Sequence, residues 1–82
     1  MLNMCVEVHN LETNKTACTP RELSSMIEVD LDFLNNYTLE EYGYTELHPD
    51  HCLCQLDIFD ACNGAGFEAK YNKNYDIEIK KK

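Results

Sequence analysis

The sequence lacks cationic side chains over nearly half of its length, because no Lys or Arg occurs between Glu22 and Asp60. The carboxylates of this acidic stretch are Glu22, Glu28, Asp30, Asp32, Glu40, Glu41, Glu46, Asp50, Asp57 and Asp60. A field of one sign repels nucleic acid and attracts basic surfaces. The stretch therefore predicts either a solvated acidic face or a docking surface for a basic partner, and it argues against direct binding of nucleic acid.

Long apolar runs are also absent, and no run approaches the roughly 20 residues that cross a bilayer. An acidic surface is repelled by anionic lipid headgroups, so we do not expect membrane association. The N-terminus has neither the basic segment nor the apolar segment of a secretory signal, so we expect the protein to remain in the cytosol.

Cysteine is abundant, but the number is odd: Cys5, Cys18, Cys52, Cys54 and Cys62. In a reducing cytosol these side chains are expected to be thiols or metal ligands rather than disulfides. The chain has 82 residues, which predicts one domain over 1–82 that buries only roughly 60 % of its unfolded surface. Chains of this size often use a disulfide, a metal or a partner as an additional source of stability.

Two hairpins are predicted, one near each end of the chain. Residues 1–10 alternate aliphatic and polar side chains and predict a strand, followed by a turn at Thr13-Asn14 that would place His9 opposite Cys18. Alternation over 67–71 and 75–79, with a polar turn between them, predicts the second hairpin. The basic tail 80–82 is expected to fray.

Helices are predicted between the hairpins. Thr19-Pro20-Arg21-Glu22 is a capping box with Pro at the first helical position, so a helix should begin there and end near Val29. Thr38-Leu39-Glu40-Glu41 repeats the pattern in a shorter turn that Gly43 would end. Residues 52–62 fit either a strand or a helix, and we favour a helix with Asp50 as its N-cap. The predicted fold is α+β, with a small antiparallel sheet from two hairpins packed with one or two short helices.

A cluster of metal-binding residue types lies in the segment from His48 to Cys54. Its candidate ligands are His48, His51, Cys52 and Cys54, and thiolate with neutral imidazole is the donor set of structural zinc sites. Further ligands could come from Cys62, from Cys5 or from the His9/Cys18 pair. The alternative is that the cysteines are small buried apolar residues and that the histidines lie on the surface.

Catalysis is not expected. A nucleophilic Cys needs a depressed pKa, whereas the surrounding negative charge would raise thiol pKa values. The pairs Glu40/Glu41 and Asp57/Asp60 are interpreted as a solvated face. Asp30-x-Asp32 lacks the Gly and the bidentate Glu of a calcium loop.

The acidic stretch is the strongest functional signal. Carboxylates with interleaved tyrosines can imitate the charge of a phosphate backbone and supply rigid contact area at a protein interface. The predicted partner-binding residues are Glu28, Asp30, Asp32, Glu40, Glu41, Glu46, Tyr42 and Tyr44.

In its size, in the base-free run from Glu22 to Asp60 and in its Asn/Lys/Tyr/Ile-rich ending over 71–79, the chain resembles the small acidic anti-CRISPR proteins that bacteriophages encode. The resemblance implies a non-enzymatic inhibitor that binds a basic surface of a CRISPR effector nuclease and blocks nucleic-acid loading. The single-protein type II effector of a low-GC Gram-positive host is one candidate target. The resemblance concerns role only, and these inhibitors share no common fold. The alternative function is a zinc-dependent regulatory or adaptor module of the cytosol, built on the His48–Cys54 cluster.

Overall fold

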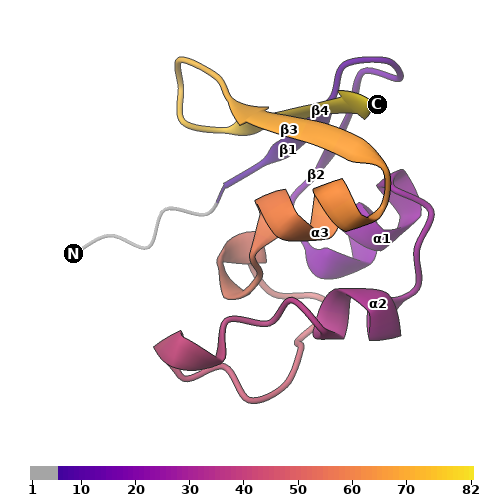
Figure 1. Cartoon of the computed structure of the whole chain (residues 1–82). Coiled ribbons are helices and arrows are strands. Elements are labelled where there is room, and N and C mark those ends of the chain that lie inside the picture. Colours follow the sequence, from indigo (N-terminus) through magenta and orange to yellow (C-terminus); the bar gives the residue numbers. More distant parts are fainter. Residues whose placement is uncertain (1–5) are drawn as a thin grey trace.

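The structure is a computed structural model that describes residues 6–82. A four-stranded sheet lies on one side of the molecule, and the helices lie on the other side, against one face of the sheet (Figure 1). The elements in chain order are β1 (Val8–Asn10), β2 (Lys15–Ala17), α1 (Pro20–Met26), α2 (Leu31–Asn35), η1 (Glu40–Tyr42), η2 (Leu53–Gln55), α3 (Ile58–Gly64), β3 (Phe67–Tyr71) and β4 (Ile77–Lys81). The predicted α+β class is confirmed.

Both predicted hairpins are present, and they meet through a parallel pair of strands. The strand order is β2-β1-β4-β3, with β1 parallel to β4 and Val8 opposite Ile77. The sheet is therefore mixed, rather than antiparallel throughout. The two central strands, β1 and β4, carry buried aliphatic side chains such as Ile79. The more polar strands β2 and β3 lie at the edges, where charged side chains discourage pairing with a further strand.

The register of the first hairpin differs from the prediction by two residues. His9 lies opposite Thr16, not Cys18. The turn is displaced because the Asn10 side chain accepts hydrogen bonds from the amides of Glu12 and Thr13 and tightens it. A shift of two residues keeps each side chain on its predicted face. The expected strand over 1–5, and the candidate ligand Cys5 with it, lie outside the described residues.

The capping box that begins α1 is confirmed. Thr19 Oγ1 accepts a hydrogen bond from the Glu22 amide at 3.2 Å, and the Glu22 carboxylate accepts one from the Cys18 amide at 2.7 Å. The helix ends at Met26, before the predicted Val29. Glu28 has φ 60°, which is incompatible with continued helix and turns the chain toward α2.

The middle of the chain differs most from the prediction. No helix was predicted over 31–35, but Asp30 caps α2 there by accepting the Phe33 amide at 2.8 Å. A helix beginning at Asp50 is wrong, because α3 is capped by Asp57 and preceded by the single turn η2. The short turn at η1 that ends at Gly43 is confirmed, but the predicted cap at Thr38 is wrong: the Thr38 hydroxyl donates to the Asn35 carbonyl, and no side chain caps η1.

One apolar core joins the sheet to the helices. Its members include Val8, Ala17, Leu23, Leu34, Leu53, Cys62, Phe67, Ile77 and Ile79. The tail that was expected to fray is paired instead: Lys80 and Lys81 lie opposite Glu68 and Phe67 in the ladder with β3. Among residues 6–82, no helix has both the length and the apolar character needed to span a bilayer.

Candidate functional site

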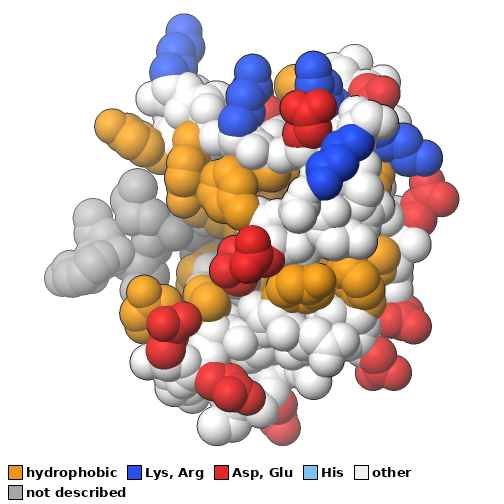
Figure 2. All heavy atoms as spheres, in the orientation of Figure 1, with side chains coloured by type: hydrophobic (Ala, Val, Ile, Leu, Met, Phe, Trp, Pro, Cys, Tyr) orange, Lys and Arg blue, Asp and Glu red, His pale blue; other side chains and the backbone are white. Residues whose placement is uncertain are grey.

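Charge divides the molecule into two parts. We call residues 6–17 and 67–82 the sheet half and residues 18–66 the helical half. On the face seen in Figure 2, the blue basic side chains gather toward the top of the view, over the sheet half, with some Asp and Glu side chains among them, while the charged side chains over the helical half below are Asp and Glu. In the helical half the basic side chain is Arg21, at its beginning. The acidic stretch of the sequence, from Glu22 to Asp60, lies entirely within the helical half.

Four of the ten carboxylates in the acidic stretch have local structural roles. Glu22, Asp30 and Asp57 accept backbone amides at the beginnings of helices. Asp50 accepts a hydrogen bond from Arg21 Nε at 2.8 Å, and this bond lowers the pKa of the Asp50 carboxyl. Both side chains of the pair are exposed to solvent, so the pair itself contributes little to stability.

The other six carboxylates form no hydrogen bond or ion pair with any residue from 6 to 82. They are Glu28, Asp32, Glu40, Glu41, Glu46 and Asp60, and all are exposed. Their charge is uncompensated by the protein itself, so it remains available to a partner.

The predicted partner-binding residues fall into two groups. Glu28, Asp30 and Asp32 lie at the junction of α1 and α2. Glu40, Glu41, Tyr42, Tyr44 and Glu46 lie on η1 and the loop that follows it. Asp30 is occupied as a helix cap, so its freedom to meet a partner is reduced. The stretch is therefore two acidic surfaces rather than one.

A groove adjoins the η1 group. It has a volume of about 370 Å³ and lies between η1, α3 and the sheet, with Glu41 and Asp57 among its lining residues. Its apolar lining consists of Val6, Leu39, Leu56, Ile58, Phe59 and Ile77, together with parts of Tyr42 and Tyr71. Tyr42 is 72 % exposed and Tyr71 is 58 % exposed, which leaves much aromatic surface in solvent.

Sequence reasoning identified only one side of this groove. Tyr42 and Glu41 were predicted, but Phe59 and Tyr71 were not, although their rings pack edge to face with centroids 4.9 Å apart. These residues come from α3 and β3 and carry no shared sequence motif. Only the packing of α3 against β3 brings them beside η1.

The four candidate zinc ligands line a single hollow of about 170 Å³. His48, His51, Cys52 and Cys54 surround it, and the two imidazole rings stack with centroids 5.0 Å apart. Their ligand atoms do not converge: within residues 6–82, no three of these four lie within 4.8 Å of one another. The hollow therefore brings the predicted residues together without forming a closed tetrahedral site.

A buried glutamine organises this hollow. The Gln55 side chain is 2 % exposed; its Oε1 accepts the His48 amide at 2.8 Å, and its Nε2 donates to the carbonyls of His48 and Cys52 at 2.9 Å each. These bonds fix the loop in the absence of regular backbone pairing.

The pKa values of three thiols, those of Cys18, Cys54 and Cys62, are raised. Burial raises the pKa of the Cys62 thiol to about 12. Burial and then the Glu7 carboxylate raise the pKa of Cys18, and burial followed by a hydrogen bond with Cys52 raises that of Cys54. Raised pKa values leave less thiolate at neutral pH, the opposite of what nucleophilic catalysis needs.

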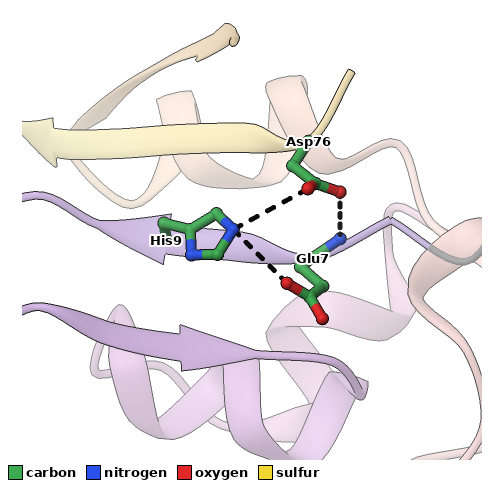
Figure 3. A group of neighbouring side chains, drawn as sticks. All are labelled: Glu7, His9 and Asp76. Atoms are coloured by element: carbon green, nitrogen blue, oxygen red, sulfur yellow. Dashed lines mark hydrogen bonds and ion pairs between the residues drawn. The ribbon is translucent and has the colours of Figure 1, made fainter. Parts of the chain in front are cut away.

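The structure has a second group of possible metal ligands. Of its members, only His9 was named as a candidate ligand from the sequence. Glu7, His9 and Asp76 meet on the face of the sheet that carries no helices, with ligand atoms that all lie within 4.8 Å of one another (Figure 3). Glu7 and His9 belong to the segment of β1, and Asp76 lies directly before β4. Because these segments are far apart in the sequence, no local spacing reveals the group.

Comparison with known protein families, with curated proteins and with solved structures gave no significant match to this chain. Function must therefore be argued from the molecule's own surfaces.

Proposed function

We propose that the protein is a non-enzymatic inhibitor that binds a basic, nucleic-acid-binding surface of a CRISPR effector nuclease through its helical half and blocks nucleic-acid loading. The type II effector is the first candidate target, and the host cytosol is the site of action. One observation carries this proposal: six exposed carboxylates without ion-pair partners lie on the helical half, while the lysines gather on the sheet half.

The charge division favours one orientation of approach. A positively lined channel attracts the helical half and repels the lysine-bearing sheet half, so long-range electrostatics orients the protein before contact. Occupation of such a channel by carboxylates would displace phosphate groups that use the same basic side chains.

The groove beside η1 supports a contact centred there. Its apolar lining and tyrosine rims can accept the stem of an Arg or Lys side chain, and the Glu41 carboxylate can pair with the charged end. Tyrosines at the centre of an interface supply large contact area at low entropic cost. The α1–α2 group would then contribute mainly to attraction at longer range.

The test compares two single charge reversals that change the net charge equally. Glu41→Lys lies beside the groove, and Glu68→Lys lies on β3 in the sheet half. With a purified type II effector nuclease in the guide-free state, we expect Glu41→Lys to raise Kd about tenfold, mainly through a slower association rate. Glu68→Lys should leave Kd unchanged or only slightly higher. Surface plasmon resonance at two salt concentrations measures both rates.

Two outcomes would contradict the proposal. Equal weakening by both variants would show that only net charge matters, and undiminished binding of a Glu40→Lys/Glu41→Lys double variant would exclude this surface. Asp30 is unsuitable for such a test, because its substitution also removes the cap of α2.

A zinc-dependent regulatory or adaptor module is a second candidate, favoured by the shared hollow of His48, His51, Cys52 and Cys54. Stoichiometric zinc in the purified protein, lost in a Cys52→Ser/Cys54→Ser variant, would support it. Zinc that survives this double substitution would eliminate it.

A further inference from the structure

The open face of the sheet carries polar side chains in register across its four strands. His9 on β1 lies between Thr16 on β2 and Glu78 on β4, and Glu78 lies opposite Lys70 on β3. Glu7 and Asp76 lie at one end of the neighbouring strands, beside His9 (Figure 3). Helices cover the opposite face, so this surface is open to solvent and to ligands (Figure 1).

The three ligand atoms have a spacing close to that around a metal ion. His9 Nε2 lies 3.4 Å from Glu7 Oε1 and 3.9 Å from Asp76 Oδ2. Bonds of about 2.0–2.2 Å to nitrogen and oxygen place neighbouring ligands of a tetrahedral zinc roughly 3.3–3.5 Å apart. Small side-chain movements would therefore bring all three atoms to bonding distance of one ion.

The histidine is oriented for coordination. Its Nδ1 lies 3.1 Å from Thr16 Oγ1, which can accept the Nδ1 proton. That hydrogen bond leaves the lone pair of Nε2 directed at the two carboxylates, as in metal-binding histidines whose other nitrogen is held by an outer partner.

The backbone holds both carboxylates in place. Glu7 and Asp76 are 69 residues apart in the chain, yet the Glu7 amide donates to Asp76 Oδ1 at 3.3 Å. The Glu7 carbonyl accepts the Ile77 amide at 2.9 Å at the edge of the β1–β4 ladder. His9 therefore lies on a paired strand, Glu7 and Asp76 lie directly before two paired strands, and little ordering is needed to bind an ion.

The charge of the group is not balanced by lysine or arginine. Within residues 6–82, the ion pairs of Glu7 and Asp76 are those with His9 alone. The two carboxylates therefore leave negative charge beside the imidazole that a bound cation can balance.

We propose that Glu7, His9 and Asp76 form a binding site for a divalent transition-metal ion, with zinc as the first candidate. Imidazole favours zinc and its neighbours over magnesium and calcium, which prefer oxygen ligands throughout. Three protein ligands leave further coordination positions directed to solvent, where water or a donor from another molecule can bind. The site is separate from the His48–Cys54 hollow and from the acidic surface of the helical half.

The experiment is a titration of the full-length, metal-free protein with ZnCl₂ by isothermal calorimetry, using near-isosteric variants. Glu7→Gln/Asp76→Asn removes two ligand charges and should weaken zinc binding by about a hundredfold or abolish it. The matched control, His48→Gln/His51→Gln, leaves the sheet unchanged and should retain this binding event. Circular dichroism of each variant checks that the fold is retained.

Two further measurements keep the test decisive if the double variant is unstable. Thr16→Val should weaken zinc binding by about tenfold or more, and Thr16→Ser should restore it, because the hydroxyl orients His9. Long-range ¹H–¹⁵N spectra of the imidazoles in the unmodified protein should show zinc binding at His9 Nε2. Zinc binding that is lost in the His48→Gln/His51→Gln variant, unchanged His9 signals, or no binding at millimolar zinc would each overturn the proposal.

Discussion

The sheet half and the helical half satisfy their backbone groups in different ways. Strand pairing supplies most of the hydrogen bonds in the sheet half. The helices are short, α2 having only 5 residues, and their exposed amides and connecting loops depend on side chains such as Thr19, Asp30, Gln55 and Asp57. Side-chain identity therefore matters more to local structure in the helical half.

This difference changes the interpretation of the acidic stretch. Carboxylates are favourable at the beginnings of helices, where they accept free amides and interact with the helix dipole. Glu22, Asp30 and Asp57 are explained in this way, without a partner. The six unpaired carboxylates remain for function, so the docking surface is smaller than the sequence suggests.

The largest expected effect tests whether the halves unfold together. Ile79→Ala in the sheet half and Leu34→Ala in the helical half each remove a side chain that is 0 % exposed from the shared core. Each should lower the free energy of unfolding by roughly 2–5 kcal/mol in one cooperative transition, because a cavity remains in a joined core. Urea denaturation followed by circular dichroism measures this. A Leu34→Ala variant with two separate transitions would show that the halves are independent.

A smaller effect should distinguish the two buried polar side chains. Gln55→Leu removes three hydrogen bonds to the backbone of the His48–Cys54 loop and should cost about 3 kcal/mol. Asn10→Ala removes two bonds at an exposed turn and should cost about 1 kcal/mol. Hydrogen exchange should rise around residues 47–56 in Gln55→Leu, with the strands still protected. Equal losses of unfolding free energy in the two variants would contradict the conclusion that local structure in the helical half depends more on side chains.

An effect that is absent at neutral pH concerns Cys62, on α3 where it packs toward the sheet. Its folded pKa is about 12, above the ordinary value of 9.0, so the folded state favours the neutral thiol. The unfolded thiol ionises first, so stability is retained below pH 9 and falls between pH 9 and 12. The slope should be about 1.4 kcal/mol per pH unit relative to Cys62→Ala. Urea denaturation of both proteins from pH 8 to 11 measures it, and identical slopes would contradict burial of this thiol.

The elements that could be predicted are those with local signals. The capping box at Thr19, the turn ending at Gly43 and the two hairpins each depend on neighbouring residues, and all are present. Helix α2 was missed because its 5 residues are too few to reveal a helical period and its apolar residues alternate with acids.

The sites were harder to predict than the elements. The His48–Cys54 cluster is contiguous, so its shared hollow could be anticipated, although the ligand geometry could not. The groove and the group of Glu7, His9 and Asp76 depend on contacts between distant segments. Such contacts follow from the parallel pairing of β1 and β4, which no local pattern specifies.

The parallel pairing of β1 with β4 also determines when the protein can fold during translation. The centre of the sheet joins Val8 to Ile77, so the β1–β2 hairpin has no neighbouring strand until the β4 segment has left the ribosome. Closing so long a loop is entropically costly and comes late. The nascent chain must therefore remain soluble with this edge unpaired until the β4 segment has been synthesised, and its abundant negative charge suits that interval.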